Sequence, residues 1–341
     1  MKKLIVTGGG FAVAKISRRL ENYFEVTLID EKEYFEFTPG ILRSITNPKH
    51  LKKIQINHKD YLKKSKFVLG KVSKIWEDYI FVNKEGIKYD YLVICSGSRY
   101  ESPIKDRDIV IASRGRNLAK YTNKLSKAKN IIIIGGGLVG IELAGEILSR
   151  YNNKNIRIIH SNERIIYRNN IKSCIYAERF LKKNNVGIIC CEKVIRKERS
   201  ELITNKNNNF KYDIAFFCTG IKPNSDFIDK KYLDSNGFIK VDKYLRMKNN
   251  VFACGDAAAV HEEKTAQASE IQASIVIKNL IALEGNKELK EYPSKERPFS
   301  ISLGLYDGIF EYKNFVITGI IPSLIKRFIE YKTMIKYRLR I

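Results

Sequence analysis

LIVTGGGFAV (residues 4–13) and IIIIGGGLVG (residues 131–140) are two copies of one pattern. Each begins with aliphatic residues typical of a buried parallel strand and continues through glycines toward a helix. The first glycine (Gly8 or Gly135) allows a tight turn, the second (Gly10 or Gly137) lets the backbone approach a pyrophosphate, and the helix N-terminus stabilises negative charge. One such pattern is weak evidence. Two in the same context predict that the chain binds two different dinucleotides and passes electrons between them.

A β-α-β unit is predicted around the first glycine turn. Its elements are a strand over 3–7, a helix over 11–22 and a strand over 25–29. The second strand ends at Asp30, twenty residues after Gly10, where an acid would bond the hydroxyls of an adenosine ribose. Val13 stands where the pattern has its third glycine, so helix and strand are expected to pack slightly farther apart.

A second β-α-β unit repeats this plan. Its elements are a strand over 131–134, a helix over 138–150 and a strand over 156–160. The last strand ends in His160-Ser161, without an acid, and Arg164 follows four residues later. The choice between NADH and NADPH therefore stays open. The predicted fold is α/β, with two Rossmann-like dinucleotide-binding domains and a short C-terminal α+β piece.

Composition narrows the class of protein. The chain has 341 residues and a formal net charge of +25, with lysines spread along its whole length. Such a charge could serve nucleic acid or an anionic membrane, but it also fits a generally lysine-rich background. No nucleic-acid motif with interleaved aromatics appears, so a non-enzymatic flavoprotein that binds nucleic acid ranks last. No apolar run is long enough for a transmembrane helix, and the six cysteines, which have neither CxxC nor CxxxxC spacing, indicate a reduced cytoplasmic setting.

Shorter predicted elements follow the two units. They are antiparallel strands within 67–82, strands over 91–95 and 214–218 that run into glycines, a hairpin tip over 205–209, a helix over 265–283, two or three strands over 299–319, and a basic amphipathic helix over 324–340.

Five ordered motifs carry a family resemblance. They are the two glycine turns, Ser96-Gly97-Ser98, Thr219-Gly220 and the Gly255-Asp256 that closes VFACGD at 251–256. Together they resemble the flavoproteins with two dinucleotide-binding domains. The resemblance implies that the first turn binds FAD, the second binds NADH or NADPH, and Asp256 binds the ribityl chain of the flavin.

Within that superfamily the chain is similar to two branches. Phe37-Thr38-Pro39 and the helix containing Gln267 and Gln272 resemble type II NADH dehydrogenases, although Ser269 replaces the usual alanine. The passages at 158–161, 218–222 and 302–308 look closer to the ferroptosis-suppressor branch of apoptosis-inducing-factor-like proteins. Both branches are NAD(P)H:quinone oxidoreductases at membrane surfaces.

The site residues follow from the turns and the resemblance. The predicted cofactor-binding residues are Gly8, Gly10, Phe11, Ala12, Asp30, Ser96, Gly97, Gly135, Gly137, Gly140, Gly220, Gly255 and Asp256. The predicted catalytic residues are Glu142, Gln267 and Gln272, and no metal is expected. Glu142 is expected near the nicotinamide, or else it is a helix N-terminal acid favoured by the macrodipole. Asp256 is expected to accept hydrogen bonds from the ribityl hydroxyls, and a role as the capping residue of the next helix is compatible with the same geometry.

The predicted reaction is hydride transfer from NAD(P)H to FAD and then to a quinone. A sulfide:quinone oxidoreductase is a rival on the same fold, but it generally needs a late redox cysteine, and no Cys follows Cys254. Another FAD-dependent pyridine-nucleotide oxidoreductase with a soluble acceptor is the remaining alternative.

The predicted domains are an FAD domain over 1–104 and 221–288, an NAD(P)H domain over 105–220, and a C-terminal piece over 289–341. In residues 324–341, apolar residues recur at near-helical spacing and basic residues outnumber a single acid, Glu330. This helix is expected to dock on an anionic membrane surface, with packing on the protein's own core as the alternative. The protein is then peripheral on the cytoplasmic face, and a homodimer is one candidate assembly.

Overall fold

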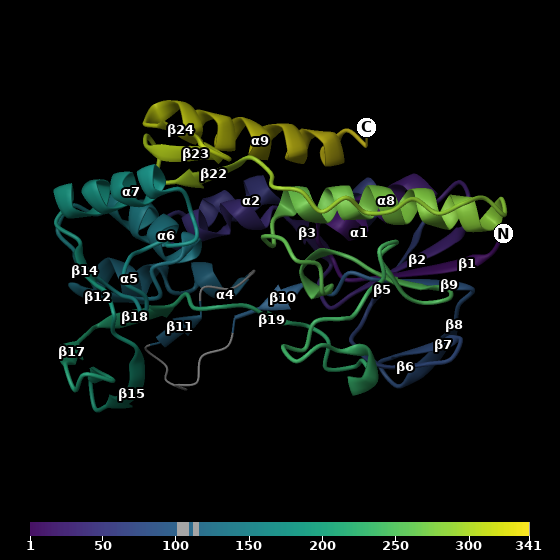
Figure 1. The fold of residues 1–341 in the computed structure, drawn as a ribbon, viewed down its shortest axis with the longest axis horizontal. Helices are drawn as coiled ribbons and strands as arrows, with labels where there is room; N and C mark the ends of the chain where they lie inside the picture. Colours follow the sequence, from purple (N-terminus) through teal and green to yellow (C-terminus); the bar gives the residue numbers. More distant parts are fainter. Residues whose placement is uncertain (101–108, 112–115, 341) are drawn as a thin grey trace.

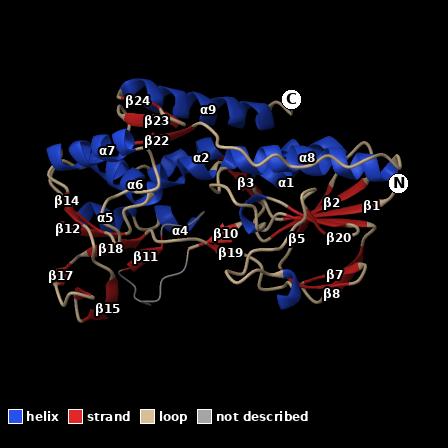
Figure 2. Cartoon of the chain, viewed as in Figure 1, coloured by secondary structure: helices blue, strands red, loops and turns tan. Residues whose placement is uncertain are grey.

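A computed structural model describes residues 1–100, 109–111 and 116–340 of the chain (Figure 1). Two parallel sheets lie side by side, and most of the helices lie on one side of them (Figure 2). The helices are α1 (Phe11–Leu20), α2 (Leu51–Ile54), α3 (His58–Tyr61), α4 (Arg116–Ala119), α5 (Thr122–Lys127), α6 (Leu138–Leu148), α7 (Ile171–Lys183), α8 (Ala266–Glu284) and α9 (Ile320–Arg338). Four short 3₁₀ helices are η1 (Thr38–Ile45), η2 (Pro48–His50), η3 (Lys230–Tyr232) and η4 (Gly255–Ala257).

The first sheet is built from two separate segments of the chain, residues 3–94 and 246–253. Its order is β20 (Arg246–Lys248), β21 (Val251–Ala253), β9 (Tyr91–Ile94), β1 (Lys3–Thr7), β2 (Glu25–Asp30) and β5 (Lys66–Leu69), and only β20 is antiparallel. Helices α1 and α8 pack together on one face. The other face shares a hydrophobic cluster with the antiparallel strands β6 (Val72–Trp76), β7 (Tyr79–Val82) and β8 (Glu85–Lys88). Burial on both faces explains why β1 and β9 are continuous aliphatic runs.

One strand prediction was wrong. Residues 67–69 were expected among antiparallel strands, but they belong to β5, which pairs in parallel with β2 at the edge of the first sheet. The strand is only half covered at this edge, with Phe67 and Val68 partly buried between two exposed residues, so its composition does not separate parallel from antiparallel pairing.

The second sheet is continuous in sequence. Its order is β11 (Ile109–Ile111), β18 (Ile214–Phe217), β12 (Asn130–Ile134), β13 (Asn155–Ile159) and β14 (Gly187–Ile189), all parallel. A hairpin sheet of β15 (Val194–Glu198), β16 (Glu201–Thr204) and β17 (Asn209–Lys211) joins it. The short strands β10 (Ser98–Arg99) and β19 (Lys222–Pro223) pair where the chain passes between the two sheets. The α/β fold with two Rossmann-like sheets is confirmed, while the predicted boundary at 104–105 lies outside the described residues.

The C-terminal piece is a three-stranded antiparallel sheet followed by α9. The strands are β22 (Phe299–Ser302), β23 (Gly308–Tyr312) and β24 (Phe315–Thr318), and the remaining pair is β3 (Tyr34–Glu36) with β4 (Gln55–Asn57). In Figure 1, α9 runs from above β22–β24 toward α8, and it contacts β22, β23 and β4. Helix α9 therefore contacts both the C-terminal sheet and the β3–β4 pair near the N-terminus. Within the described residues, no helix is both long and apolar enough to cross a bilayer.

Candidate active site and dinucleotide sites

The first glycine turn requires glycine for two reasons. Gly8 has a φ of +109°, and a Cβ there would lie 2.2 Å from the carbonyl oxygen of Cys95. Gly10 is the N-cap of α1 and gives its first turn no side-chain hydrogen bond. The side chains of Phe11 and Ala12 are buried in the core, so these two predicted residues can offer a ligand only their backbone amides.

Asp30 is held at the end of β2 by a buried histidine. The imidazole Nε2 of His58 lies 3.1 Å from Oδ2 of Asp30, and its Nδ1 lies 2.7 Å from the hydroxyl of Tyr61. A Cβ on Gly9 would collide with the Asp30 carboxylate, at 1.8 Å. The middle glycine of the turn is therefore needed to make room for Asp30, a constraint that the motif alone did not reveal.

The second turn has the same geometry and an open face. Gly135 has a φ of +108°, and a Cβ on Gly140 would lie 2.0 Å from the carbonyl oxygen of Gly135. A Cβ on Gly137, by contrast, would meet no atom of the described residues within 4 Å. The backbone there leaves space for a ligand that a larger side chain would fill.

Helix N-termini support the same assignment. Asn170 and Thr265 cap α7 and α8 with side-chain oxygens. Helices α1 and α6 begin at glycines, without a side-chain cap among the described residues. Their first amide groups are left for another acceptor, so both turns fit a pyrophosphate.

The strand-end glycines gather around Asp256. Gly97 and Gly255 have positive φ values of +71° and +77°. The hydroxyl of Ser98 donates to Oδ2 of Asp256 at 2.8 Å, which joins the ends of β9 and β21. Two further predicted residues lie at the crossing between the sheets. The hydroxyl of Ser96 donates to the carbonyl of Asn224 at 2.6 Å, and Gly220 has a φ of +50° with open space beyond it.

The two predicted glutamines of α8 behave differently. Gln272 is buried, accepts the amide of Gly255 at 2.7 Å and donates to Glu262 at 2.6 Å. Gln272 therefore holds the Gly255-Asp256 turn in place through the backbone amide of Gly255. Gln267 is exposed in the first turn of α8.

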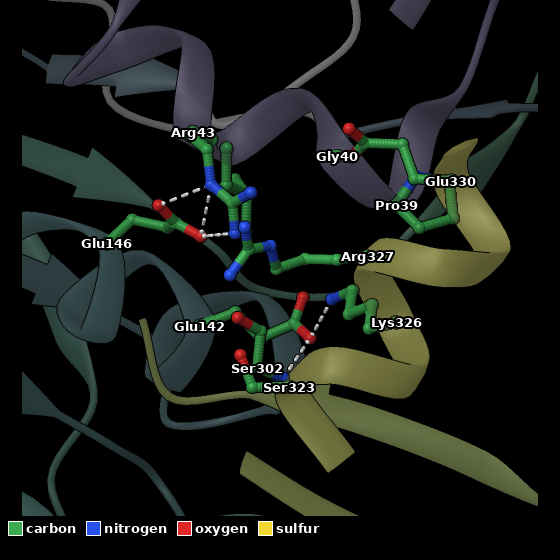
Figure 3. Close-up of a pocket in the computed structure, with 11 residues that line it drawn as sticks. Pro39, Gly40, Arg43, Glu142, Glu146, Ser302, Ser323, Lys326, Arg327 and Glu330 are labelled. Atoms are coloured by element: carbon green, nitrogen blue, oxygen red, sulfur yellow. Dashed lines mark hydrogen bonds and ion pairs between the residues drawn. The ribbon is translucent and has the colours of Figure 1, made fainter. Parts of the chain in front are cut away.

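Glu142 lies in a polar cluster that α9 completes (Figure 3). Its Oε1 accepts the backbone amide of Ser302 at 2.9 Å and pairs with the ammonium group of Lys326. The side chains of Glu142 and Lys326 are only 14% and 17% exposed, so solvent screens the pair weakly. The sequence singled out Glu142, but nothing local to it indicated Lys326, which lies 184 residues away.

A second buried ion pair lies beside the first. Arg43 of η1 binds both carboxylate oxygens of Glu146 of α6, with distances between 2.9 and 3.2 Å. These two pairs line a narrow cavity together with Pro39, Gly40, Leu42, Ser302, Ser323, Arg327 and Glu330. Residues of η1, α6, β22 and α9 therefore line the same cavity.

Tyr100 is a partly buried phenol within electrostatic reach of Glu142 and Asp256. Burial raises the pKa of its phenol strongly, and the neighbouring Cys218, Asp256 and Glu142 raise it further. Asp256 and Glu142 therefore both favour the neutral form of Tyr100, which keeps its proton. Sequence reasoning missed Tyr100, since it belongs to no motif.

The cysteines are poorly suited to thiol chemistry. The sulfurs of Cys95 and Cys254 lie 3.3 Å apart in the core, and burial raises the pKa of Cys95 well above its usual range. Burial also raises the pKa of Cys218, Cys174 and Cys190. Thiolates are the reactive form, so a mechanism through these buried thiols is disfavoured. Cys191 is exposed and lies outside the cavity lining.

Comparison with known proteins agrees with this geometry. A family model described as "Pyridine nucleotide-disulphide oxidoreductase" matches residues 2–273. Apoptosis-inducing factor homolog B of Dictyostelium discoideum is 28% identical over 90% of this chain and 89% of its own length. Ferroptosis suppressor protein 1 of Taeniopygia guttata is 27% identical over 95% of this chain and 92% of its own length.

Two solved structures share the fold at lower identity. The sulfide:quinone oxidoreductase of Aquifex aeolicus superposes with a TM-score of 0.88 at 18% identity, covering 100% of this chain and 92% of its own. NDH2 of Plasmodium falciparum in complex with NADH gives a TM-score of 0.88 at 15% identity, covering 99% of this chain and 96% of its own. At these identities the likeness concerns the fold alone.

Proposed function

Because the chain belongs to the pyridine nucleotide-disulphide oxidoreductase family, it is an FAD-dependent NAD(P)H oxidoreductase, and we propose that its electron acceptor is a quinone reached from a membrane surface. Hydride acceptance from NAD(P)H and delivery of electrons to an acceptor are the chemistry that bound FAD supplies. One observation carries the proposal. Helix α9 presents its polar face to the cavity at Glu142 and its apolar face to solvent.

The polar face of α9 contributes to the site. Lys326 holds Glu142, and Glu330 lies 3.3 Å from Nε2 of the buried His50. We propose that Glu142, fixed by Lys326 and by the amide of Ser302, positions the nicotinamide. The cations Lys326 and Arg43 would then stabilise the negative charge that develops on a quinone during reduction.

The outer face of α9 is apolar. Leu324, Phe328 and Tyr331 are 49%, 63% and 64% exposed, and they recur at helical spacing. Arg327 and Lys332 are exposed beside them. Large apolar side chains next to cations suit the headgroup region of an anionic bilayer, which would give the site access to a lipid-soluble quinone.

The inner side of the same helix packs on the core. Met334 and Tyr337 are 2% and 0% exposed, and the ring of Tyr337 lies 4.7 Å from that of Phe35. Core packing and membrane docking were alternatives in the sequence, but the two faces of α9 allow both. Removing the helix would disturb the core, so the membrane proposal needs point substitutions.

The first experiment tests the acceptor. The FAD-loaded protein should reduce a short-chain quinone with NADH or NADPH as donor, and should turn over much more slowly with sulfide as donor or with a disulfide as acceptor. Turnover should persist when Cys190 and Cys191 are both changed to Ser, because neither thiol lines the cavity. Faster quinone reduction with sulfide than with NADH or NADPH as the donor would favour the sulfide:quinone alternative.

The second experiment tests the membrane. The variant Leu324→Ser, Phe328→Ser, Tyr331→Ser should lose flotation with anionic vesicles by about tenfold or more, because three inserted side chains each contribute about 1 kcal/mol or more. Tyr23→Ser is the matched control, since Tyr23 is 58% exposed on another part of the surface. Equal flotation of the variant and the control would show that α9 is not the docking surface.

A further inference from the structure

Two structurally equivalent positions carry different chemistry. The amide of Gly8 donates to the carbonyl of Ile29 at 2.8 Å, and the amide of Gly135 donates to the carbonyl of Ile159 at 2.8 Å. Asp30 and His160 are the next residues, so they occupy the same place in the two units. Each packs against the middle glycine of its own turn.

His160 is a buried and neutral residue at the strand end. It is 8% exposed, and its Nδ1 accepts the amide of Gly136 at 3.2 Å. Burial lowers the pKa of His160, while the backbone carbonyl of Arg164 acts in the opposite direction. A neutral imidazole that accepts at Nδ1 carries its proton on Nε2. This Nε2 is itself buried and makes no hydrogen bond by geometry to the described residues, so His160 leaves the strand end uncharged rather than offering a donor to a ligand.

The loop after His160 is pinned to the glycine turn and is basic. The amide of Ile166 donates to the carbonyl of Gly136 at 2.8 Å. Between residues 160 and 168 this loop has two arginines, Arg164 and Arg168, and one acid, Glu163. The contacts of the two arginines with acids are long, at 3.8 Å to Glu178 and 3.7 Å to Glu263.

The nearest buried acid is committed elsewhere. Glu192 follows β14, and its amide donates to the carbonyl of His160 at 3.0 Å. Its carboxylate accepts hydrogen bonds from the hydroxyl of Thr204 at 2.8 Å and from the side-chain amide of Asn208 at 2.9 Å. It is therefore satisfied by the hairpin sheet and does not replace the missing strand-end acid.

We propose that the second dinucleotide site selects NADPH, because the strand end at His160 carries no carboxylate and because the exposed Ser161 hydroxyl and Arg164 beyond it can bind the 2′-phosphate and compensate its charge. A strand-end carboxylate accepts both ribose hydroxyls and repels a 2′-phosphate, whereas a donor beside an arginine accommodates it. The inference rests on the donor half of the proposed function and is independent of the quinone and of the membrane.

The test measures binding without turnover. Calorimetry on the FAD-loaded protein compares 2′,5′-ADP with 5′-AMP, which differ only in the 2′-phosphate. Wild type should bind 2′,5′-ADP about tenfold or more tightly, as expected for one charge-assisted contact. His160→Glu should abolish this preference, and Arg164→Gln should reduce it about threefold or more.

Asn153→Glu is the matched control. Asn153 is exposed and precedes the start of β13, whereas His160 follows the end of that strand. The substitution therefore adds the same negative charge far from the glycine turn and should leave the preference for 2′,5′-ADP unchanged. Equal affinity of wild type for the two ligands, a preference that survives His160→Glu, or failure of both ligands to bind would overturn the proposal. A quinone assay on the same samples reports separately on the proposed function.

Discussion

Asp30 shows what a single residue reveals in sequence and in structure. Its spacing from Gly10 predicted a ribose-binding acid, but His58 and Tyr61 could not be predicted as its supports. A carboxylate only accepts, so His58 donates to Asp30 from Nε2, and its Nδ1 shares a hydrogen bond with the hydroxyl of Tyr61. Burial raises the pKa of Tyr61 well above its usual range, so the phenol keeps its proton.

Changes at Asp30 and His58 should weaken FAD to different degrees. Asp30→Ala removes a charge-assisted bond to the ribose and should weaken FAD by about 1.5–3 kcal/mol. His58→Phe keeps the carboxylate but frees its rotamer, so the loss should be about 1 kcal/mol. Fluorescence titration of apoprotein with FAD measures both.

A control is available in His261→Phe, because His261 is exposed and remote from the turn in sequence. Unchanged FAD affinity in both Asp30→Ala and His58→Phe would mean that the first turn does not hold the flavin dinucleotide.

At the scale of elements, the sequence predicted the two β-α-β units because local patterns encode them. Strand β1, helix α6 and helix α8 all lie within a few residues of their expected bounds. Helix α9 begins at Ile320, four residues before its predicted start at 324, because Pro322 lies in its first turn, where no intrahelical N–H bond is required. Pairing of β5 was missed because register between strands is a long-range property.

The two glycine turns respond differently to substitution. Gly137→Val should fold normally, because its Cβ meets no described atom, yet it should abolish NAD(P)H binding by filling the space for the pyrophosphate. FAD should stay bound. Fluorescence of the flavin and calorimetry with NADPH measure the two sites separately.

Gly8→Ala is the informative contrast. It forces a Cβ to within 2.2 Å of a backbone oxygen at a φ of +109°, so loss of soluble protein is expected. Release of FAD from Gly137→Val would reverse the assignment of the two turns.

At the scale of the whole molecule, contacts between distant segments build the site. Glu142 was found from its helix, whereas Lys326, Ser302 and Arg43 reach it or its neighbour from other parts of the chain. No local pattern encodes such meetings, because they depend on how α9 and η1 pack on α6. The motif residues were therefore predictable and their partners were not.

The ion pair of Arg43 and Glu146 should stabilise the packing of η1 on α6. The side chains of Arg43 and Glu146 are 16% and 6% exposed. Arg43→Ala would leave the Glu146 carboxylate buried without a partner, which should lower the free energy of unfolding by about 3–5 kcal/mol. Urea unfolding followed by circular dichroism measures this loss.

The double variant Arg43→Met, Glu146→Leu is the control, and it should recover most of the lost stability because both charges are removed together. Equal instability of the single and double variants would show that packing, not the unpaired charge, is responsible.

The strand order of the first sheet has a consequence for biosynthesis. The second sheet uses residues 109–217 without interruption, so it can close as soon as that segment leaves the ribosome. The first sheet must wait for β21 at 251–253, and Tyr337 must arrive before the rings of Phe35 and Tyr61 are covered. The amino-terminal strands are thus translated first and completed last. We expect nascent chains to hold their flavin site open, in need of protection from aggregation, until translation is nearly finished.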